Sequence, residues 1–573
     1  MLLAGKLSML SLLSLRMLYI QIIDGSKYKT LSDKNRINVI MLPPHRGKIR
    51  DADGKIIADN KNIFNLKLDK LENAKYVESL ELLYKLLSLK PYEIEVIHRK
   101  AKNIYSRFPG KIMDNLTWKQ VAIIEENISK LKGLYVDIGQ GRNYYFKESL
   151  SHPIGYISTL SDRDKKNLGI NKMIDLEVGK AGVEKSYEDS LRGEFGIKEA
   201  EVNAHGQIIR EISHRPSIAG NDLSLNIDCE IQEKVFHLMP KKGGILAIID
   251  LENGALISSV STPSYNPNQL SGRISSEYWN SILKNPYKPL INKAIQSNYP
   301  PGSIFKMAVV LAALEAGLNP DHKIECTGRS ALGGSRFKCW YKPGHGMVNL
   351  KKAIKHSCNT YMYHIAKEIG NDKIIETAKK LGFGELTGID IPNESSGLVP
   401  TTSWKRQRFG QKWHLGDSLN TSIGQGFVLS TPLQMLRFCS AIATGKLLTP
   451  RIHGMQDHQE IDIKEEHLNF LRSAMYDVMN QPGGTGYHHR IKDSKWLIAG
   501  KTGTCQVRSK IKNEDLSLIS TPWKSRNHGV FIGYGPFHNP RYAMSVLVEH
   551  GGGASSCLPI AKDIFLELFK KYL

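Results

Sequence analysis

Three short motifs combine a serine hydroxyl with lysine amines in an order that suits acyl transfer. Ser303-Ile304-Phe305-Lys306 comes first, Ser357-Cys358-Asn359 comes second, and Lys501-Thr502-Gly503-Thr504 lies near the C-terminus. A serine hydroxyl attacks a carbonyl carbon efficiently only when a base removes its proton. A lysine can be that base if burial or a neighbouring cation lowers its pKa. The combination therefore predicts a serine nucleophile with a lysine base.

The segment around Ser303 is predicted to begin a helix, because Pro300-Pro301-Gly302 precedes it. Residues three apart share one face of a helix, so we expect the Lys306 amine to reach the Ser303 hydroxyl. Lys501 is the candidate for the second cation that lowers the pKa of Lys306. The N-terminus of the helix also favours developing negative charge at Ser303.

The other two motifs supply groups that suit a peptide substrate. We expect Ser357 to relay a proton and Asn359 to hydrogen-bond a substrate amide. The Lys-Thr-Gly-Thr segment follows the apolar run 496–499 and is therefore expected on a strand. There Gly503 would let a substrate backbone approach closely. The Thr502 and Thr504 hydroxyls, together with the Lys501 amine, suit a carboxylate.

This prediction rests on the order and context of the three motifs, because Ser-x-x-Lys by itself is a weak signal. Lys-Thr-Gly occurs once in the chain. Ser-x-x-Lys recurs, and elsewhere a solvated helix or loop is the plainer interpretation; it recurs at Ser26, Ser129, Ser281, Ser335 and Ser509.

Three cysteines and a histidine lie between the first two motifs: Cys326, Cys339, His345 and Cys358. Three thiolates and one imidazole make a tetrahedral Zn²⁺ set. Their spacing is not the compact one of zinc fingers, so two alternatives stay open: a Cys326–Cys339 disulfide, and His345 as a general base. The remaining cysteines are interpreted as buried or surface thiols; they are Cys229, Cys439, Cys505 and Cys557.

The N-terminal residues 1–23 carry only Lys6 and Arg16 as charged side chains. A helix of this length reaches about 30 Å or more, so it is predicted to be an uncleaved transmembrane signal anchor. An amphipathic helix is the alternative. Residues 24–215 are predicted to form a pedestal or docking domain. It contains a β-hairpin turning at Asp53-Gly54, a helical insert over 73–132, and a second hairpin turning at His205-Gly206.

The C-terminal domain, residues 220–573, is predicted to be α+β. Asp228 should begin a helix, and Asn253-Gly254 should join two apolar strands over 243–249 and 255–260. A helical middle follows, over about 303–480. Strands are expected again at 497–500, 529–534 and 542–549, before a last helix over about 560–572. Strands at both ends of a helical middle indicate an antiparallel sheet.

Composition narrows the class of protein. The chain has 573 residues, of which 41% are hydrophobic and 23% charged, as in ordinary globular proteins. Its formal net charge of +22 indicates an anionic neighbour such as a membrane face or an acidic polymer. Because the basic residues form no block and no recognition motif is present, a nucleic-acid partner is not predicted.

The three motifs, with further segments along almost the whole chain, resemble class B penicillin-binding proteins, and most of all the rod-elongation type. Asn359 stands where many relatives have Asp. The other resembling segments are Arg46-Gly47-x-Ile49-x-Asp51-x-x-Gly54, 179–188 with Leu191-Arg192-Gly193, Ser422–Gly426, Thr431–Gln434 and Glu549-His550-Gly551. The resemblance implies a penicillin-binding-protein/β-lactamase-like transpeptidase domain on an elongated pedestal behind one transmembrane helix.

The resemblance also implies an activity and roles. The chain would be a serine-type D-Ala-D-Ala transpeptidase/carboxypeptidase that cross-links peptidoglycan stem peptides during elongation and is inhibited by β-lactams. Ser303 would be the acylated nucleophile and Lys306 its base. The backbone N–H groups of Ser303 and Thr504 would form the oxyanion hole, and Lys501, Thr502 and Thr504 would hold the substrate carboxylate.

Cofactor and partners follow from the same resemblance. Elongation-type relatives carry zinc in the Cys/His segment, which implies structural Zn²⁺ there. The implied partners are a SEDS-type glycosyltransferase and rod-complex scaffold proteins, at the bacterial inner membrane with the catalytic domain in the periplasm. The alternatives left open are a division-type transpeptidase and a β-lactam-binding sensor or scaffold without turnover.

Overall fold

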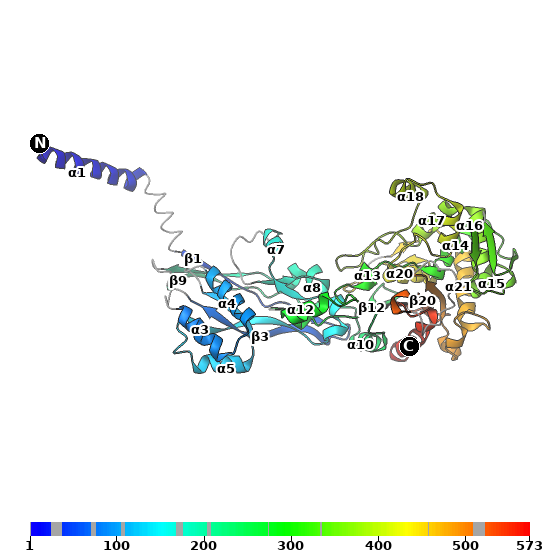
Figure 1. Ribbon diagram of the computed structural model, residues 1–573, viewed down its shortest axis with the longest axis horizontal. Coiled ribbons are helices and arrows are strands. Elements are labelled where there is room, and N and C mark those ends of the chain that lie inside the picture. The colour runs from blue at the N-terminus through cyan, green and yellow to red at the C-terminus, as the bar shows by residue number, and fades with distance from the viewer. Residues whose placement is uncertain are drawn as a thin grey trace.

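The computed structural model describes residues 2–23, 37–69, 76–104, 109–167, 176–202, 208–272, 274–332, 335–455, 458–507 and 522–573. Figure 1 shows an elongated molecule, with the single helix α1 at one end, a strand-rich middle and a larger helix-rich body at the other end. Ser26, Ser509 and the predicted His205-Gly206 turn lie outside the described residues.

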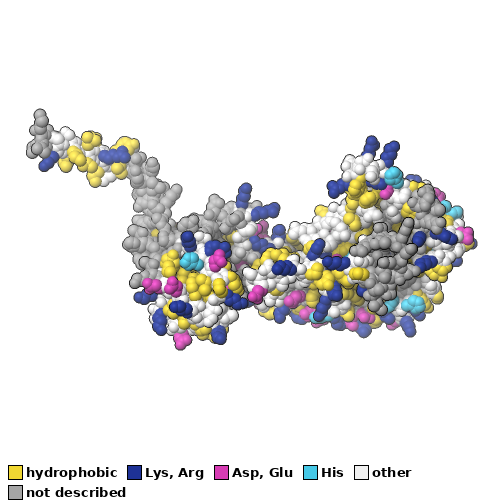
Figure 2. All heavy atoms as spheres, viewed as in Figure 1, with side chains coloured by type: hydrophobic (Ala, Val, Ile, Leu, Met, Phe, Trp, Pro, Cys, Tyr) yellow, Lys and Arg dark blue, Asp and Glu magenta, His cyan; other side chains and the backbone are white. Residues whose placement is uncertain are grey.

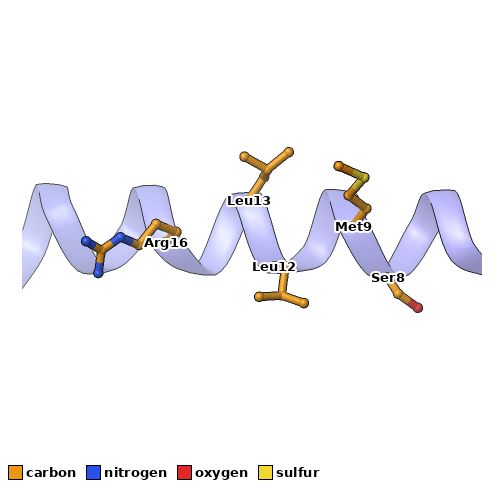
Figure 3. Close-up of a pocket in the computed structure, with 5 residues that line it drawn as sticks. All are labelled: Ser8, Met9, Leu12, Leu13 and Arg16. Atoms are coloured by element: carbon orange, nitrogen blue, oxygen red, sulfur yellow. The ribbon is translucent and has the colours of Figure 1, made fainter.

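The first helix, α1 (Leu2–Leu18), is followed by one turn of π-helix, η1 (Tyr19–Ile23). The apolar side chains that are described on it, from Met9 onward, are exposed, with Leu12 71% accessible. Figure 3 shows Met9 and Leu13 pointing to one side of α1 and Ser8 and Leu12 to the other, so the shallow hollow along it is an open helix surface. Among the described residues, no helix combines the length and apolar character needed to cross a membrane. The transmembrane anchor therefore stays a prediction.

The pedestal is built on two antiparallel-rich sheets. One has the strand order β1-β8-β9, and the other has the order β10-β2-β3-β4 with β5 also paired to β3. The bounds are β1 (Ile37–Leu42), β2 (Ile49–Arg50), β3 (Ile56–Leu68), β4 (Gly110–Leu116), β5 (Leu134–Tyr144), β6 (Ile157–Thr159), β7 (Glu177–Gly179), β8 (Gly196–Val202), β9 (Ile208–Arg215) and β10 (Leu223–Ser224). The predicted hairpin at Asp53-Gly54 is confirmed, because β2 and β3 pair antiparallel across it.

The predicted helical insert over 73–132 is only partly helical, because β4 also lies in it and extends the sheet. The pedestal helices are α3 (Tyr76–Leu86), α4 (Pro91–Asn103), α5 (Trp118–Glu126), α6 (Ser151–Ile154), α7 (Asp162–Asn167), α8 (Gly182–Ser186) and α9 (Glu188–Arg192). Helices α3, α4 and α5 cover a separate small core around Leu66 and Leu68 of β3. The other end of β3, at Ile57 and Ala58, belongs to the large core that continues into the C-terminal domain. Strand β3 thus joins both cores, and its partner β5 does the same, with Leu134 in the small core and Tyr144 in the large one.

A buried ion cluster holds the two pedestal segments that resemble the family. Glu184 is fully buried, and Arg46 and Arg142 donate hydrogen bonds to its carboxylate at 2.7 and 2.8 Å. Arg46 also pairs with Glu188, and the Tyr144 hydroxyl lies 3.2 Å from Glu184. Burial by itself would raise the pKa of Glu184, but the two guanidinium groups outweigh it and the pKa is lowered. The carboxylate stays ionised and ties distant segments together.

The C-terminal domain contains the predicted antiparallel sheet, with strand order β12-β11-β21-β20-β19. The α+β expectation is therefore confirmed, as is the hairpin at Asn253-Gly254. The sheet strands are β11 (Gly244–Asp250), β12 (Leu256–Thr262), β19 (Ala499–Cys505), β20 (His528–Gly535) and β21 (Tyr542–Val548). Small two-stranded ladders are formed by β13 (Ile324–Cys326) with β16 (Gly346–Val348), β14 (Arg329–Leu332) with β15 (Ser335–Lys338), and β17 (Lys446–Leu447) with β18 (Gln459–Glu460).

Helices fill the middle of this domain and pack on the sheet. They are α10 (Cys229–Leu238), α11 (Pro267–Leu270), α12 (Ser276–Leu283), α13 (Lys293–Gln296), α14 (Lys306–Glu315), α15 (Leu350–Lys355), α16 (Asn359–Ile369), α17 (Asn371–Lys380), α18 (Thr402–Phe409), α19 (Leu415–Thr421), α20 (Pro432–Thr444), α21 (Glu465–Asn480) and α22 (Leu558–Tyr572). Asp228 caps α10 by accepting hydrogen bonds from two backbone N–H groups, as predicted. Figure 2 shows Lys and Arg side chains spread over both regions of the face in view.

We predict that Glu184→Gln destabilises the protein strongly. Removal of the charge leaves the buried Arg142 guanidinium without its carboxylate and leaves Arg46 with Glu188 alone. Breaking a buried ion pair from one side costs about 3–5 kcal/mol. Chemical denaturation of the full chain measures the effect. Glu277→Gln is the matched control, because Glu277 forms only an exposed pair with Lys90 and should change the unfolding midpoint little. Similar midpoints for the two variants would contradict a structural role for the cluster.

Candidate active site

The predicted nucleophile, Ser303, lies in a short 3₁₀ turn, η3 (Gly302–Ile304), directly before α14. A helix start is therefore found where the sequence predicts it, although the α-helix itself begins at Lys306. The buried side chains of α14 run from Lys306 to Leu314, so the turn sits on the end of a core helix. Within the described part of the chain, the Ser303 hydroxyl makes no hydrogen bond, and the hydrogen bonds of the Lys306 amine go to other groups.

Backbone contacts hold this turn. Gly302 N–H donates to the Gly424 carbonyl at 2.9 Å, and both glycines have left-handed φ angles, +56° and +68°. A Cβ at Gly424 would lie 2.1 Å from the Gly302 oxygen, so a side chain there is excluded. Gln425 donates to the Thr504 carbonyl at 3.3 Å. The segment Ser422–Gly426, one of those that resemble the family, thus connects the Ser303 turn to strand β19.

The Lys306 amine points to the second motif. Its Nζ donates to the Ser357 carbonyl at 2.8 Å and to the Asn359 Oδ1 at 2.7 Å, and it lies 3.1 Å from the Ser357 Oγ. The side chain is completely buried. Burial lowers the pKa of Lys306 to about 8, although the nearby thiols of Cys358 and Cys339 act in the opposite direction. The neutral amine, which can accept a proton, is thereby accessible near neutral pH.

A second buried amine meets the first at the same hydroxyl. Lys501 Nζ lies 3.2 Å from the Ser357 Oγ and donates to the Thr502 carbonyl at 2.9 Å. Burial lowers the pKa of Lys501 well below its ordinary value, and the positive charge of Lys306 lowers it further. Ser357 adopts a left-handed backbone conformation, with φ +53°. The hydroxyl between the two lysines can pass a proton from one amine to the other.

The third motif lies on β19, as predicted, and β19 is an edge strand of the five-stranded sheet. It pairs with β20 on one side, and on the other side it faces the Ser303 turn. A Cβ at Gly302 would lie 2.8 Å from the Thr504 oxygen, so these backbones touch. An edge strand beside a nucleophile can accept an extended peptide.

A second set of buried polar side chains fixes the chain just before the nucleophile. The Tyr299 hydroxyl donates to the Glu549 carboxylate at 2.8 Å, and the Lys293 amine donates to the same carboxylate at 2.5 Å. Tyr299 also exchanges two backbone hydrogen bonds with Ser430. Among these residues, only Glu549 lies in a segment singled out from the sequence.

The four predicted metal ligands, Cys326, Cys339, His345 and Cys358, lie together, with ligand atoms within 4.8 Å of one another. The sulfurs of Cys326 and Cys339 are each 3.5 Å from His345 Nδ1. The group also touches the active site, because the Asn359 backbone N–H donates to the Cys339 sulfur at 3.4 Å. All seven cysteines are free and buried, which leaves no Cys326–Cys339 disulfide in the described chain.

One residue at this site was not predicted from the sequence. Thr485 lies in the loop after α21, and its hydroxyl oxygen is 2.5 Å from the Thr502 hydroxyl oxygen. The only signal in the sequence is the run Pro482-Gly483-Gly484, which indicates a tight turn but no particular contact.

Comparison with known proteins agrees with this geometry. A family model described as the penicillin binding protein transpeptidase domain matches residues 244–570, and one described as the penicillin-binding protein dimerisation domain matches residues 41–225. The peptidoglycan D,D-transpeptidase MrdA of Acinetobacter baumannii is 33% identical, and the match covers 97% of this chain and 85% of that protein.

Two solved structures are similar over most of the chain. The complex between penicillin-binding protein 2 (PBP2) and MreC from Helicobacter pylori gives a TM-score of 0.84 at 32% identity, covering 94% of this chain and 99% of that one. A peptidoglycan synthase complex that coordinates polymerization and crosslinking gives a TM-score of 0.69 at 25% identity, covering 98% and 96%.

Three features define the class of protein: the five-stranded sheet, the serine turn beside its edge strand, and the paired lysines. The class is a penicillin-binding transpeptidase domain carried on a penicillin-binding-protein dimerisation domain. Within that class, the chain belongs to the PBP2 (MrdA) family of class B penicillin-binding proteins. The resemblance noted in the sequence is thereby confirmed.

We predict that Gly424→Ala destabilises the Ser303 turn by more than the backbone strain of an alanine in the left-handed conformation. Gly410→Ala is the matched control, because Gly410 has a similar φ of +67° but no atom within 4 Å of an added Cβ. The control should lower the free energy of unfolding by about 1 kcal/mol, because alanine is strained in the left-handed conformation. Gly424→Ala should lower it further, because the added side chain must also displace Gly302. Thermal unfolding and the rate of labelling by fluorescent penicillin measure both variants. Equal losses in both would contradict the proposed support of the turn.

Proposed function

We propose that this chain is a serine D,D-transpeptidase that cross-links peptidoglycan stem peptides during cell elongation. The observation that carries the proposal is the convergence of two fully buried lysine amines on the Ser357 hydroxyl, beside the Ser303 turn. Burial lowers the pKa of both amines, and for Lys501 the neighbouring charge of Lys306 adds to it. The family relationship supplies the substrate class, since the relatives are peptidoglycan D,D-transpeptidases.

In the proposed reaction, the Ser303 oxygen attacks the carbonyl carbon of the penultimate D-Ala. Neutral Lys306 takes the hydroxyl proton, and the bond to the terminal D-Ala nitrogen breaks to leave an acyl-enzyme. Ser357 delivers a proton to the departing amine, drawing on the two lysines that contact it. The amine of a neighbouring stem peptide then attacks the ester and releases Ser303. Water in its place gives the carboxypeptidase reaction, and β-lactams acylate the same serine oxygen as their ring amide bond breaks.

Transition-state stabilisation is assigned to backbone groups. The N–H groups of Ser303 and Thr504 lie on segments that touch each other through Gly302. Two donors aimed at a developing oxyanion are each worth about 3–4 kcal/mol in other acyl-transfer enzymes. The hydroxyls of Thr502 and Thr504 and the amine of Lys501 would hold the substrate carboxylate, with Gly503 leaving room for its backbone.

Labelling with fluorescent penicillin tests the assignment of Ser303. The purified full-length protein should form a covalent, denaturation-resistant adduct, and Ser303→Ala should abolish it. Ser281→Ala is the matched control, because Ser281 also begins a Ser-x-x-Lys sequence but lies exposed on α12 and bonds only Tyr278. Labelling of the Ser303→Ala variant would refute the assignment of Ser303 as the nucleophile. A folded wild-type protein without any label would favour the alternative of a scaffold without turnover.

We further propose that the Cys/His cluster holds structural zinc. A tetrahedral ion with Zn–S of about 2.3 Å and Zn–N of about 2.0 Å places sulfur and nitrogen roughly 3.5 Å apart. This matches the 3.5 Å separations from His345 Nδ1 to the sulfurs of Cys326 and Cys339. Four protein ligands leave no open position, so the ion would supply structure and not a nucleophile. The ion would lie next to Asn359, which directly follows the ligand Cys358.

Metal analysis tests this proposal. We expect about one zinc per chain by mass spectrometry, and Cys339→Ser should lose most of it and lower the melting temperature. Cys439→Ser is the control, because Cys439 is equally buried but lies on α20, outside the cluster. It should keep its zinc. An unchanged zinc content in the Cys339 variant would rule out the assigned ligands.

The cellular setting follows from the family. The H. pylori complex contains PBP2 and MreC, and the synthase complex couples polymerization to crosslinking. We therefore propose a rod-complex scaffold protein and a SEDS-type glycosyltransferase as partners, with the pedestal as the coupling surface. The exposed apolar side chains of α1 support anchoring at the inner membrane, which would place the C-terminal domain in the periplasm.

A further inference from the structure

The loop that carries Thr485 is packed tightly on both sides of that residue. It follows α21 directly, and Thr485 is flanked by Gly484 and Gly486, which are buried. A Cβ at Gly484 would lie 2.3 Å from the Val478 carbonyl oxygen, and one at Gly486 would lie 2.3 Å from the Met479 sulfur. A backbone atom excludes a side chain at Gly484, and a side chain at Gly486 would have to displace Met479, so the loop lies directly against the end of α21. This close packing fixes the direction in which Thr485 projects.

Thr485 joins two of the three catalytic motifs. Its Oγ1 lies 2.5 Å from the Oγ1 of Thr502 on β19, and its backbone N–H donates to the Lys355 carbonyl at 3.4 Å. Next to it, the Gly483 carbonyl contacts His356 Nδ1 at 3.0 Å. Lys355 and His356 directly precede Ser357. The loop therefore ties the edge strand to the segment that presents the Ser357 hydroxyl.

The pair of threonine hydroxyls can be oriented in only two ways. A hydroxyl carries one proton, so one of the two donates to the other and the second proton points elsewhere. A carboxylate only accepts hydrogen bonds, so a hydroxyl that binds it must direct its proton outward. If Thr485 donates to Thr502, the proton of Thr502 is left for the substrate. A hydroxyl that accepts a hydrogen bond is also a better donor.

We propose that Thr485 is a positioning residue that donates its hydroxyl proton to Thr502 and thereby holds Thr502 as a hydrogen-bond donor to the substrate carboxylate. The inference rests on the proposed transpeptidase function and adds a determinant of its specificity for an anionic terminus. Thr502 itself is only 5% exposed, so its orientation is set by the protein and not by solvent. The role of Thr485 is exerted through Thr502, without a requirement for direct contact with substrate.

The test compares two thioesters of benzoyl-D-alanine with the full-length protein: one ends in a mercaptoacetate carboxylate, and the other ends in the corresponding amide. We expect Thr485→Val to raise KM for the carboxylate substrate roughly 3- to 10-fold, which is the range for loss of one oriented hydrogen bond. Its kcat should change little, and the amide substrate should be turned over as by the wild type. Thr485→Ser keeps the hydroxyl and should restore the wild-type KM.

Several outcomes would overturn the inference. An equal loss with both substrates, or a fall in kcat alone, would mean that Thr485 is only structural, and an unchanged KM would mean that it has no role. Thr485→Ala is the second variant, because its smaller side chain fits the same loop if valine prevents folding, and the same KM increase is expected from it. If the wild-type protein forms no acyl-enzyme with either thioester, it is the proposed function that fails, and the two failures are thus distinguishable.

Discussion

The interaction on which the active site depends is the burial of two lysine amines around one serine hydroxyl. Lys306 and Lys501 are both completely buried, and each lies within about hydrogen-bond distance of the Ser357 oxygen, at 3.1 and 3.2 Å. In water, hydration stabilises the ammonium form and both amines would stay protonated. A buried ammonium group loses this hydration, and its pKa therefore falls. Exclusion of water is therefore the condition for a lysine base. The core helix α14 and the central sheet supply it.

The groups that surround this pair are placed mainly by backbone contacts. The Ser303 turn is hydrogen-bonded to the Gly424 carbonyl, and Gly302 of the turn packs against the Thr504 carbonyl. On the other side, Asn359 binds Lys306 through its side chain and the Cys339 sulfur through its backbone. Backbone supports of this kind tolerate little displacement. A disturbance of the Cys/His cluster would reach Lys306 through Asn359 and through Ser357, which Cys358 directly follows.

The pedestal is connected to the active-site domain by a continuous core and not by a flexible linker. Strand β3 contributes to the small core under α3, α4 and α5 at one end and to the large core at the other. The Glu184 cluster lies near the second end and joins segments far apart in the sequence. The paired strands β3 and β5 therefore connect the far end of the pedestal to the large core. This arrangement suits a domain whose relatives are found in complexes with other proteins.

The sequence by itself determined the class of fold and predicted which groups react. Ser303, Lys306, Ser357, Asn359 and Lys501 stand in motifs whose order indicates the chemistry, and local signals predicted the Asn253-Gly254 hairpin and the strand that carries Lys501. These predictions succeed because turn formation, strand alternation and helix starts depend on neighbours in the chain.

Tertiary structure alone decided the contacts among those groups. The helical spacing predicted that Lys306 reaches Ser303, yet its amine is held by Ser357 and Asn359, which another segment brings into the core. The contact of Thr485 with Thr502 and the contacts of Tyr299 and Lys293 with Glu549 have no signal in the sequence and become visible only in the fold. The β4 strand within the helical insert was likewise decided by pairing with β3. Contacts between distant segments depend on packing and burial, for which spacing along the chain gives no measure.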